Sequence, residues 1–221
     1  MSHNHDDFAV EPLPGLPAIP PQGETILWQG RPESGAVGRH VFHLRMIAVY
    51  FAILAAWRVV TVVADGAPLA DAAITVAILA ALAVASIGLF ALIARAISRS
   101  TVYTITTKRV VMRIGVALPV TLNLPFARID GAALVRHGDD SGSIALTLAP
   151  GERIAYAVLW PHVRPWQMRQ PSPMLRCIPD AEKVAGILAQ AYAAAQPARV
   201  ARAGTAEQAG ANRPSLSPAA G

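Results

Sequence analysis

Two long apolar runs dominate the first half of the chain and predict a pair of membrane-spanning helices. The stronger run, residues 72–94, has no charged residue over 23 positions. A helix of that length spans about 35 Å, more than a hydrocarbon core of about 30 Å. The weaker run, residues 46–64, carries one charge, Arg58, and a turn with Gly and Pro separates the two runs. We expect a transmembrane helical hairpin over residues 46–94, since a buried helix pair in a soluble core seldom needs so long an uncharged stretch.

The charges that flank these runs predict their orientation. Basic residues beside membrane helices stay in the cytoplasm. The flanks are basic and the connecting turn is acidic: Arg31, Arg39, Arg45, Arg95 and Arg99 lie outside the runs, and Asp65 and Asp71 lie between them. We expect a multi-pass protein of the cell inner (intracytoplasmic) membrane with both termini in the cytoplasm.

Arg58 stands inside the first predicted membrane helix. A charge at the centre of such a helix costs roughly 2.5–3.5 kcal/mol. Arg58 lies near the turn, so its side chain can extend outward toward Asp65. The alternative is a contact with an acidic or polar group on a partner helix, which makes Arg58 a candidate partner-binding residue.

The second half of the chain alternates apolar and polar positions with a period of two. This pattern places one face of each strand on a core and the other face in water. The alternating runs are residues 103–107, 110–114, 120–124, 129–137, 144–148 and 154–160. Such short strands with tight connections predict a small antiparallel β barrel or sandwich. Only residues 98–100 separate it from the hairpin, so we expect the domain to sit directly on the cytoplasmic membrane face.

A single amphipathic helix follows the predicted strands. From Ala181 to Ala195 the apolar residues form one stripe at helical spacing, and Pro197 is expected to end the helix. We expect this helix to cap the β domain, which would then cover residues 98–195. The alternative is a helix on the membrane surface, but Lys183 is its only basic residue and such helices carry several.

The remaining segments complete the predicted domain organisation. Residues 1–22 are rich in proline, which disfavours helices and strands. Residues 196–221 are rich in Ala, Pro, Ser, Gly and Arg. We expect both to be disordered tails, and residues 23–45 to be a cytoplasmic segment ahead of the hairpin.

The composition supports a membrane protein. Of the 221 residues 53% are hydrophobic and 15% are charged, with a net charge of +5, whereas roughly a quarter of residues are charged in soluble domains. Nucleic-acid binders are basic but rarely so apolar, so we expect membrane lipid and not nucleic acid as a partner. The single Cys, at position 177, excludes a disulfide scaffold and a Cys-based metal site. A small apolar filler is its simplest role.

The sequence shows no catalytic apparatus. It lacks the GxSxG, HExxH, P-loop and GxGxxG motifs. We therefore expect a protein that is not an enzyme, with no catalytic residues, no metal site and no cofactor.

Four histidines lie outside the N-terminal tail. His40 and His43 are three residues apart, which puts both on one face if a helix spans them. They are candidates for ligating a metal or the magnesium of a bacteriochlorophyll; the alternative is two polar residues at the level of the lipid headgroups. His137 and His162 fall at predicted strand ends, and we expect both on the surface.

Residues 160–169 interleave aromatic, basic and proline residues. Trp and Arg are enriched in binding anchors and also at lipid headgroups. The alternative is a loop along the sheet whose tryptophans plug the core, continued by residues 170–179, a proline-rich stretch expected to make few hydrogen bonds of its own. The candidate partner-binding residues here are Trp160, Arg164, Trp166 and Arg169.

Three segments resemble bacterial membrane proteins with a pleckstrin-homology-like (PH-like) domain. They are GETILWQGRP at 23–32 ahead of the hairpin, YTITTKRVVMRIG at 103–115, and LPFARI at 124–129. The resemblance implies a PH-like β domain. Such barrels can bind lipid headgroups through basic loops, and the candidates here are Arg99, Lys108, Arg109 and Arg113.

A closer resemblance is to the photosynthetic complex assembly family of purple bacteria, which is encoded near the reaction-centre H subunit. FAVEP at 8–12 and PMLRCIPD at 173–180 add to the match. The resemblance implies a non-enzymatic assembly factor that holds nascent subunits of the reaction centre and of the core light-harvesting complex. A second copy of the chain is a further candidate partner. The alternative is a generic membrane-anchored PH-like module for lipid binding or envelope stress.

Overall fold

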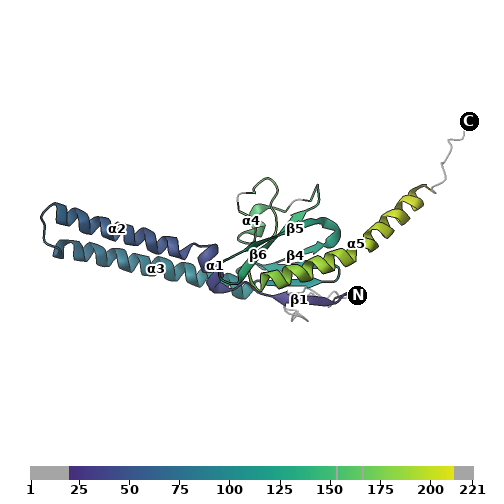
Figure 1. Cartoon of the computed structure of the whole chain (residues 1–221), viewed down its shortest axis with the longest axis horizontal. Helices are drawn as coiled ribbons and strands as arrows, with labels where there is room; N and C mark the ends of the chain where they lie inside the picture. The colour runs from purple at the N-terminus through teal and green to yellow at the C-terminus, as the bar shows by residue number, and fades with distance from the viewer. Residues whose placement is uncertain (1–19, 153, 166, 212–221) are drawn as a thin grey trace, which may run out of the picture.

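The computed structural model describes residues 20–152, 154–165 and 167–211, with side chains to residue 196. The molecule is elongated, with a two-helix hairpin at one end and a β domain at the other (Figure 1). Most of the predicted tail 1–22 lies outside the described residues, as does the end of the predicted tail 196–221.

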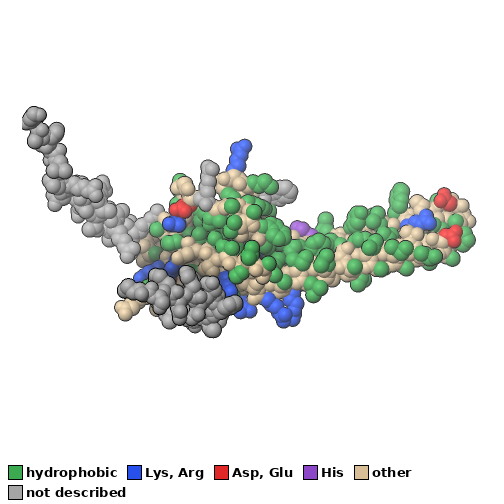
Figure 2. All heavy atoms as spheres, turned by 180° about the vertical axis from the view of Figure 1, so that it is seen from behind, with side chains coloured by type: hydrophobic (Ala, Val, Ile, Leu, Met, Phe, Trp, Pro, Cys, Tyr) green, Lys and Arg blue, Asp and Glu red, His purple; other side chains and the backbone are tan. Residues whose placement is uncertain are grey.

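The hairpin consists of α2 (Leu44–Ala64) and α3 (Ala70–Ser100). Both helices are long and apolar enough to span a membrane. In their most apolar stretches of 18 residues, 6% of the α2 stretch and 0% of the α3 stretch is buried. Figure 2 shows hydrophobic side chains along the visible face of the hairpin. The exposure rules against a buried helix pair in a soluble core. α3 continues to Ser100, so only Thr101 separates it from the first strand of the β domain.

A four-stranded antiparallel sheet follows the hairpin, with strand order β1-β2-β3-β4. β2 begins at the end of α3 and leads away from it, and β3 returns toward it. The β2–β3 turn therefore lies at the end of the domain far from the hairpin, and the β3–β4 turn lies at the near end. The strands are β1 (Ile26–Gly30), β2 (Val102–Thr106), β3 (Arg109–Ile114) and β4 (Val120–Pro125).

A three-stranded antiparallel sheet completes the β structure, with strand order β5-β6-β7. The short 3-10 helix η1 (Phe126–Arg128) joins it to the first sheet. Residues from both sheets and from the last helix form one core, which includes Tyr103, Ile105, Met112, Ile144, Leu175 and Leu188. The strands are β5 (Ile129–Arg136), β6 (Ser141–Leu148) and β7 (Met174–Pro179).

Five of the six predicted strands are confirmed, and the sixth is wrong. Residues 156–159 form a short helix, α4 (Tyr156–Leu159). A strand would have placed Tyr156, Val158 and Trp160 on one face, but Leu159 is the side chain that is fully buried, while Val158 and Trp160 are exposed. Burial of the out-of-phase residue overrides the local alternation.

The proline-rich stretch 170–179 is also different from the expectation of a loop with few hydrogen bonds. Its second half is β7, which pairs with β6 over Ser141↔Pro179 to Ala145↔Met174. Pro171 and Pro173 precede the strand and Pro179 is its last residue, where a missing N–H removes no central ladder bond. β1 is a further strand that the alternating pattern did not predict, and the sheets hold seven strands in total over the described residues.

The C-terminal helix α5 (Ala181–Ala211) is longer than predicted, because it continues past Pro197. Alanine is the strongest helix former, and alanines stand on both sides of that proline. The first half of α5 packs on the core through Val184, Leu188 and Ala191, which confirms the capping role. A short helix that the sequence pattern did not predict, α1 (Ser34–His40), precedes the hairpin.

Candidate functional site

The junction between hairpin and β domain is a packed interface. α1 lies against α3 and also contacts β7. Ala36 and Val37 of α1, Ala94 of α3 and Cys177 of β7 form a buried cluster, and the backbone N–H of Glu33 donates to the Cys177 carbonyl at 2.8 Å. Cys177 is therefore an apolar filler, as the sequence suggested. The junction fixes the β domain relative to the two-helix hairpin.

A polar cluster joins α1 to the β5–β6 turn on the same side of the domain. Asp139 accepts hydrogen bonds from Arg39 at 2.6 and 3.0 Å and from Ser141 at 2.6 Å, and its carboxylate lies 3.0 Å from His40 Nε2. The Ser141 hydroxyl first, and then His40 and Arg39, hold the pKa of Asp139 well below its usual range. The His40 ring stacks on His137 with centroids 4.2 Å apart. This cluster ties the helical junction to the sheet.

His40 and His43 do not share a helical face, which corrects the premise of a ligand pair. His40 is the last residue of α1, and His43 precedes α2 with a left-handed backbone, φ 51°. Because the chain breaks between α1 and α2, the two histidines belong to different helices. His40 is in addition paired with Asp139. No cluster of three His, Cys, Asp or Glu side chains suited to a metal occurs among the described residues.

His162 is buried, contrary to the expectation of a surface residue, with 2% of its surface exposed. Its Nδ1 lies 2.5 Å from the Tyr103 hydroxyl and its Nε2 lies 3.2 Å from the Thr101 hydroxyl. Tyr103 also accepts from the backbone N–H of Arg176, so its proton is available to Nδ1. Burial, and then the charge of Arg176, lower the pKa of His162 to about 3. His162 is thus a neutral structural residue beneath the end of α3.

The predicted partner-binding segment forms a projecting loop between α4 and β7 (Figure 1). Trp160 is 56% exposed, and Arg164 and Arg169 are also exposed, so Trp160 does not plug the core. Trp166 lies outside the described residues. Backbone hydrogen bonds, including Arg164 N–H to the Ser172 carbonyl at 3.0 Å, hold the base of the loop. The segment presents aromatic and basic groups to its surroundings.

Arg58 occupies the α3-facing side of α2 and is partly buried there. The structure gives its guanidinium no ion pair with Asp65 or with any other described residue. Thr61, one turn later, donates to the Arg58 carbonyl at 2.9 Å. Contact between Arg58 and a partner helix stays a prediction, although this side of α2 faces α3.

The four predicted headgroup residues do not form one cluster. Arg99 is exposed near the end of α3, and Arg113 lies opposite Val102, so both are at the hairpin end of the domain. Lys108 and Arg109 lie at or beside the β2–β3 turn, at the far end. A membrane surface that meets Arg99 is therefore separated from Lys108 and Arg109 by the length of the sheet.

Arg109 is in addition committed to a carboxylate within the protein. Its guanidinium donates to both Glu24 oxygens, at 2.7 and 2.6 Å, and the Thr106 hydroxyl donates to the same carboxylate at 2.7 Å. The hydrogen bond from Arg109 holds the pKa of Glu24 below its ordinary value, against the effect of burial. The role of Arg109 in this geometry is to anchor the segment before β1 onto the sheet.

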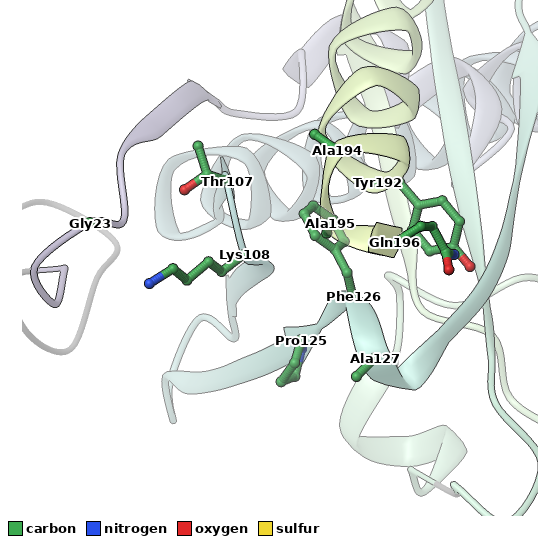
Figure 3. A pocket seen from close by; sticks show the side chains of 10 residues that line it. All are labelled: Gly23, Thr107, Lys108, Pro125, Phe126, Ala127, Tyr192, Ala194, Ala195 and Gln196. Carbon is green, nitrogen blue, oxygen red and sulfur yellow. The ribbon is translucent and has the colours of Figure 1, made fainter. Parts of the chain in front are cut away.

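Two cavities border α5 in the part of the domain remote from the hairpin. One, of about 530 Å³, lies between the β2–β3 turn, η1 and α5 (Figure 3), and Lys108 is the charged residue among its described lining side chains. The other, of about 340 Å³, is lined mainly by apolar residues of β5 and α5. Tyr192 lines both and donates to the Ile129 carbonyl at 3.1 Å. Neither cavity brings together an acid, a base and a nucleophile among the described residues.

Comparison with known proteins identifies the architecture. Residues 42–192, which include the hairpin and nearly all of the β domain, match the bacterial PH domain family. The chain belongs to this family. The bacterial PH domain is here one unit with its two long apolar helices, consistent with the packed junction at α1.

A curated relative from Rhodobacter capsulatus covers more of the chain. It is named as an uncharacterized 23.7 kDa protein in the puhA 5' region, and it is 44% identical over 189 residues, which is 84% of this chain and 87% of that protein. No solved structure gives a significant match.

Proposed function

We propose that this protein is a non-enzymatic assembly factor for the photosynthetic reaction centre and core light-harvesting complex in the inner membrane. The observation that carries the proposal is the relative from a purple bacterium, whose name places it in the puhA 5' region. It agrees with the resemblance to an assembly family encoded near the reaction-centre H subunit. In this proposal the hairpin holds nascent membrane subunits and the PH domain holds their cytoplasmic segments.

The outer face of the hairpin supports helix–helix association. Small residues allow helices to approach closely in lipid. Five of them lie on the side of α3 that faces away from α2, and all five are exposed: Ala77, Ala80, Ala81, Ala85 and Gly88. A Cβ atom added at Gly88 would meet nothing within 4 Å. This face is unfilled within the monomer, so a helix of a nascent subunit can pack there.

The cytoplasmic part of the proposal rests on the loop after α4. Trp160 and Met168 are 56% and 71% exposed, and Arg164 and Arg169 lie beside them in the sequence. Exposed Trp and Arg residues are frequent binding anchors. Because the junction at α1 fixes the domain to α3, a subunit held by the hairpin would meet this loop in a defined geometry.

Co-purification tests the proposal most directly. The tagged full-length chain is isolated in mild detergent from photosynthetically grown membranes, and the subunits that accompany it are identified. We expect reaction-centre subunits with the wild type and their loss with Gly88→Ile, because the larger side chain blocks close helix approach without clashing inside the monomer. Leu92→Ile, an exposed apolar exchange on the same helix, is the matched control and should retain them.

Two results would contradict an assembly role. One is purification of the wild type without any pigment-protein subunit, and the other is a deletion strain with normal reaction-centre levels. Retention of anionic lipid alone would favour the alternative, a generic membrane-anchored PH-like module for lipid binding or envelope stress.

A further inference from the structure

The β3–β4 turn exposes apolar side chains at the hairpin end of the domain. It contains Gly115, Val116, Ala117, Leu118 and Pro119, without a polar side chain. Val116 is 56% exposed and Leu118 is 82% exposed, which makes Leu118 the most exposed large apolar residue in the described part of the chain, the hairpin included. Turns that face water are usually polar. This turn therefore needs a different explanation.

The backbone of Gly115 builds the turn in this form. Its φ is +108°, and a Cβ atom at this position would collide with the Leu118 carbonyl oxygen. Only glycine adopts that conformation without strain. The tight return of the chain leaves Val116 and Leu118 with no core to cover them, so the turn projects them outward.

The strand register places this turn beside the last turns of α3. Val102, two residues after the end of α3, pairs with Arg113, and Ile114 pairs with Val120 beyond it. β3 also contacts α3, and β1, in the same sheet, continues the direction of the hairpin (Figure 1). At about 3.3 Å per residue the turn reaches back by roughly 10 Å, which equals about seven residues of helix. Leu118 then lies near the level of Arg95.

Arg95 and Arg99 mark where the lipid headgroups meet the hairpin. The uncharged part of α3 ends at Ala94, and Arg45 stands at the corresponding start of α2. If the hairpin spans the membrane, arginines at this position lie among the headgroups. Apolar side chains at the same level border the acyl chains, where their burial is favourable.

We propose that the Gly115–Pro119 turn inserts into the cytoplasmic leaflet and anchors the PH domain to the bilayer at a third point. Val116 and Leu118 enter the boundary between headgroups and acyl chains, and Arg99 lies close to the lipid phosphates. The partner is the lipid surface itself. This proposal rests on the membrane insertion of the hairpin that the proposed function assumes. Because the turn is held at the level of the headgroups, this third contact limits tilting of the domain relative to the membrane plane.

Depth measurements on the full-length chain test the proposal. Cys177 is the only cysteine and is fully buried, so single introduced cysteines can be labelled with an environment-sensitive fluorophore. Leu118→Cys reports on the turn, Leu82→Cys reports on the middle of α3, and Leu27→Cys is the matched control, an exposed leucine of β1 remote from the hairpin. Each variant is reconstituted in vesicles of phosphatidylcholine and phosphatidylglycerol that contain lipids with nitroxide-labelled acyl chains.

We expect a blue-shifted emission and quenching by the nitroxide lipids at positions 118 and 82, and neither at position 27. A label at 118 that behaves like the label at 27, while 82 is quenched, would overturn the turn proposal and leave the membrane hairpin intact. Absence of quenching at 82 would instead overturn the hairpin, and with it the basis of the proposed function.

A second variant keeps the test independent of the label at 118. In a Leu118→Asp background, a fluorophore at Val116→Cys should lose its blue shift, because a carboxylate resists entry into the acyl region. The fold should be unchanged, since Leu118 makes no buried contact. An unchanged blue shift would contradict the proposal. A label on the turn that is blue-shifted in native membranes but not in the lipid vesicles would also contradict it, because a protein partner and not lipid would then cover the turn.

Discussion

Two buried polar groups illustrate how single residues hold this domain together. Glu24 is buried before β1 and is paired with Arg109, 85 residues later. His162 lies beneath the end of α3 and joins Thr101 to Tyr103. Buried polar groups destabilise a fold unless they have partners, so each of these residues makes stability depend on contacts between distant parts of the chain.

Glu24→Gln should destabilise the domain by on the order of 2 kcal/mol, since it replaces charge-assisted hydrogen bonds and leaves Arg109 without its counter-charge. Thermal and denaturant unfolding in detergent measures the change. Glu152→Gln is the matched control, because its pair with Arg128 is mostly exposed, at 57% and 40% for the two side chains, and exposed pairs contribute little. Equal losses of stability in the two variants would contradict the stabilising role of the buried pair of Glu24 and Arg109.

The same carboxylate predicts a pH dependence. The pKa of Glu24 is lowered in the folded state, so its contribution is present above the unfolded value of about 4.5 and is lost as pH falls through the folded pKa. Wild type should lose stability faster than Glu24→Gln below that pH. Parallel profiles would show that the carboxylate is not stabilised by folding.

His162 predicts a separate loss of stability on acidification, which begins at a higher pH than the loss caused by Glu24. Its pKa is lowered from about 6.5 to about 3, so the unfolded chain binds a proton that the folded chain does not bind between these values. Stability should therefore fall as pH drops below about 6.5, by about 1.4 kcal/mol per pH unit for one proton. His162→Gln should flatten the profile between pH 6.5 and 4.5, a range above the titration of Glu24. An unchanged slope there would contradict the buried neutral state.

At the scale of the elements, the sequence pattern predicted the helices and strands whose form is set by their own residues. The apolar runs predicted α2 and α3, and alternation predicted β2 to β6, because each pattern recurs over many residues. β7 and α4 were missed since their form depends on β6 and on the burial of Leu159, which no local period encodes. The pairing of Arg109 with Glu24 and the separation of Lys108 from Arg99 depend on strand direction, so the sequence could not place the predicted headgroup residues.

The packing of α1 against α3 gives a prediction for the junction. Ala94 is 1% exposed in the cluster with Ala36 and Val37, so Ala94→Leu should overpack it and destabilise the docked state by about 1–3 kcal/mol. Limited trypsin digestion should then cut faster at Arg39, in α1. Ala91→Leu, an exposed position one turn earlier on α3, is the control. Equal cleavage of the two variants would show that α1 does not lock the domain.

At the scale of the whole molecule, charge and shape predict the same orientation. The free end of the hairpin carries Asp65 and Asp71, and its other end carries Arg45, Arg95 and Arg99 beside the β domain. Arginine-rich flanks remain in the cytoplasm, and a folded domain of two sheets would have to cross the membrane to lie on the other side. From both considerations we predict that the PH domain and both termini lie in the cytoplasm.

A pair of cysteine variants tests this orientation with the native Cys177 buried. Leu69→Cys lies in the hairpin turn, where the leucine is 62% exposed, and Leu27→Cys lies in β1, where it is 42% exposed. In intact spheroplasts a membrane-impermeant maleimide should label position 69 and spare position 27, and permeabilisation should expose both. The reverse pattern would invert the topology and remove the PH domain from any cytoplasmic partner. Labelling of neither site before permeabilisation would show that the turn does not reach the outer face, so the helices would lie along the membrane instead of spanning it.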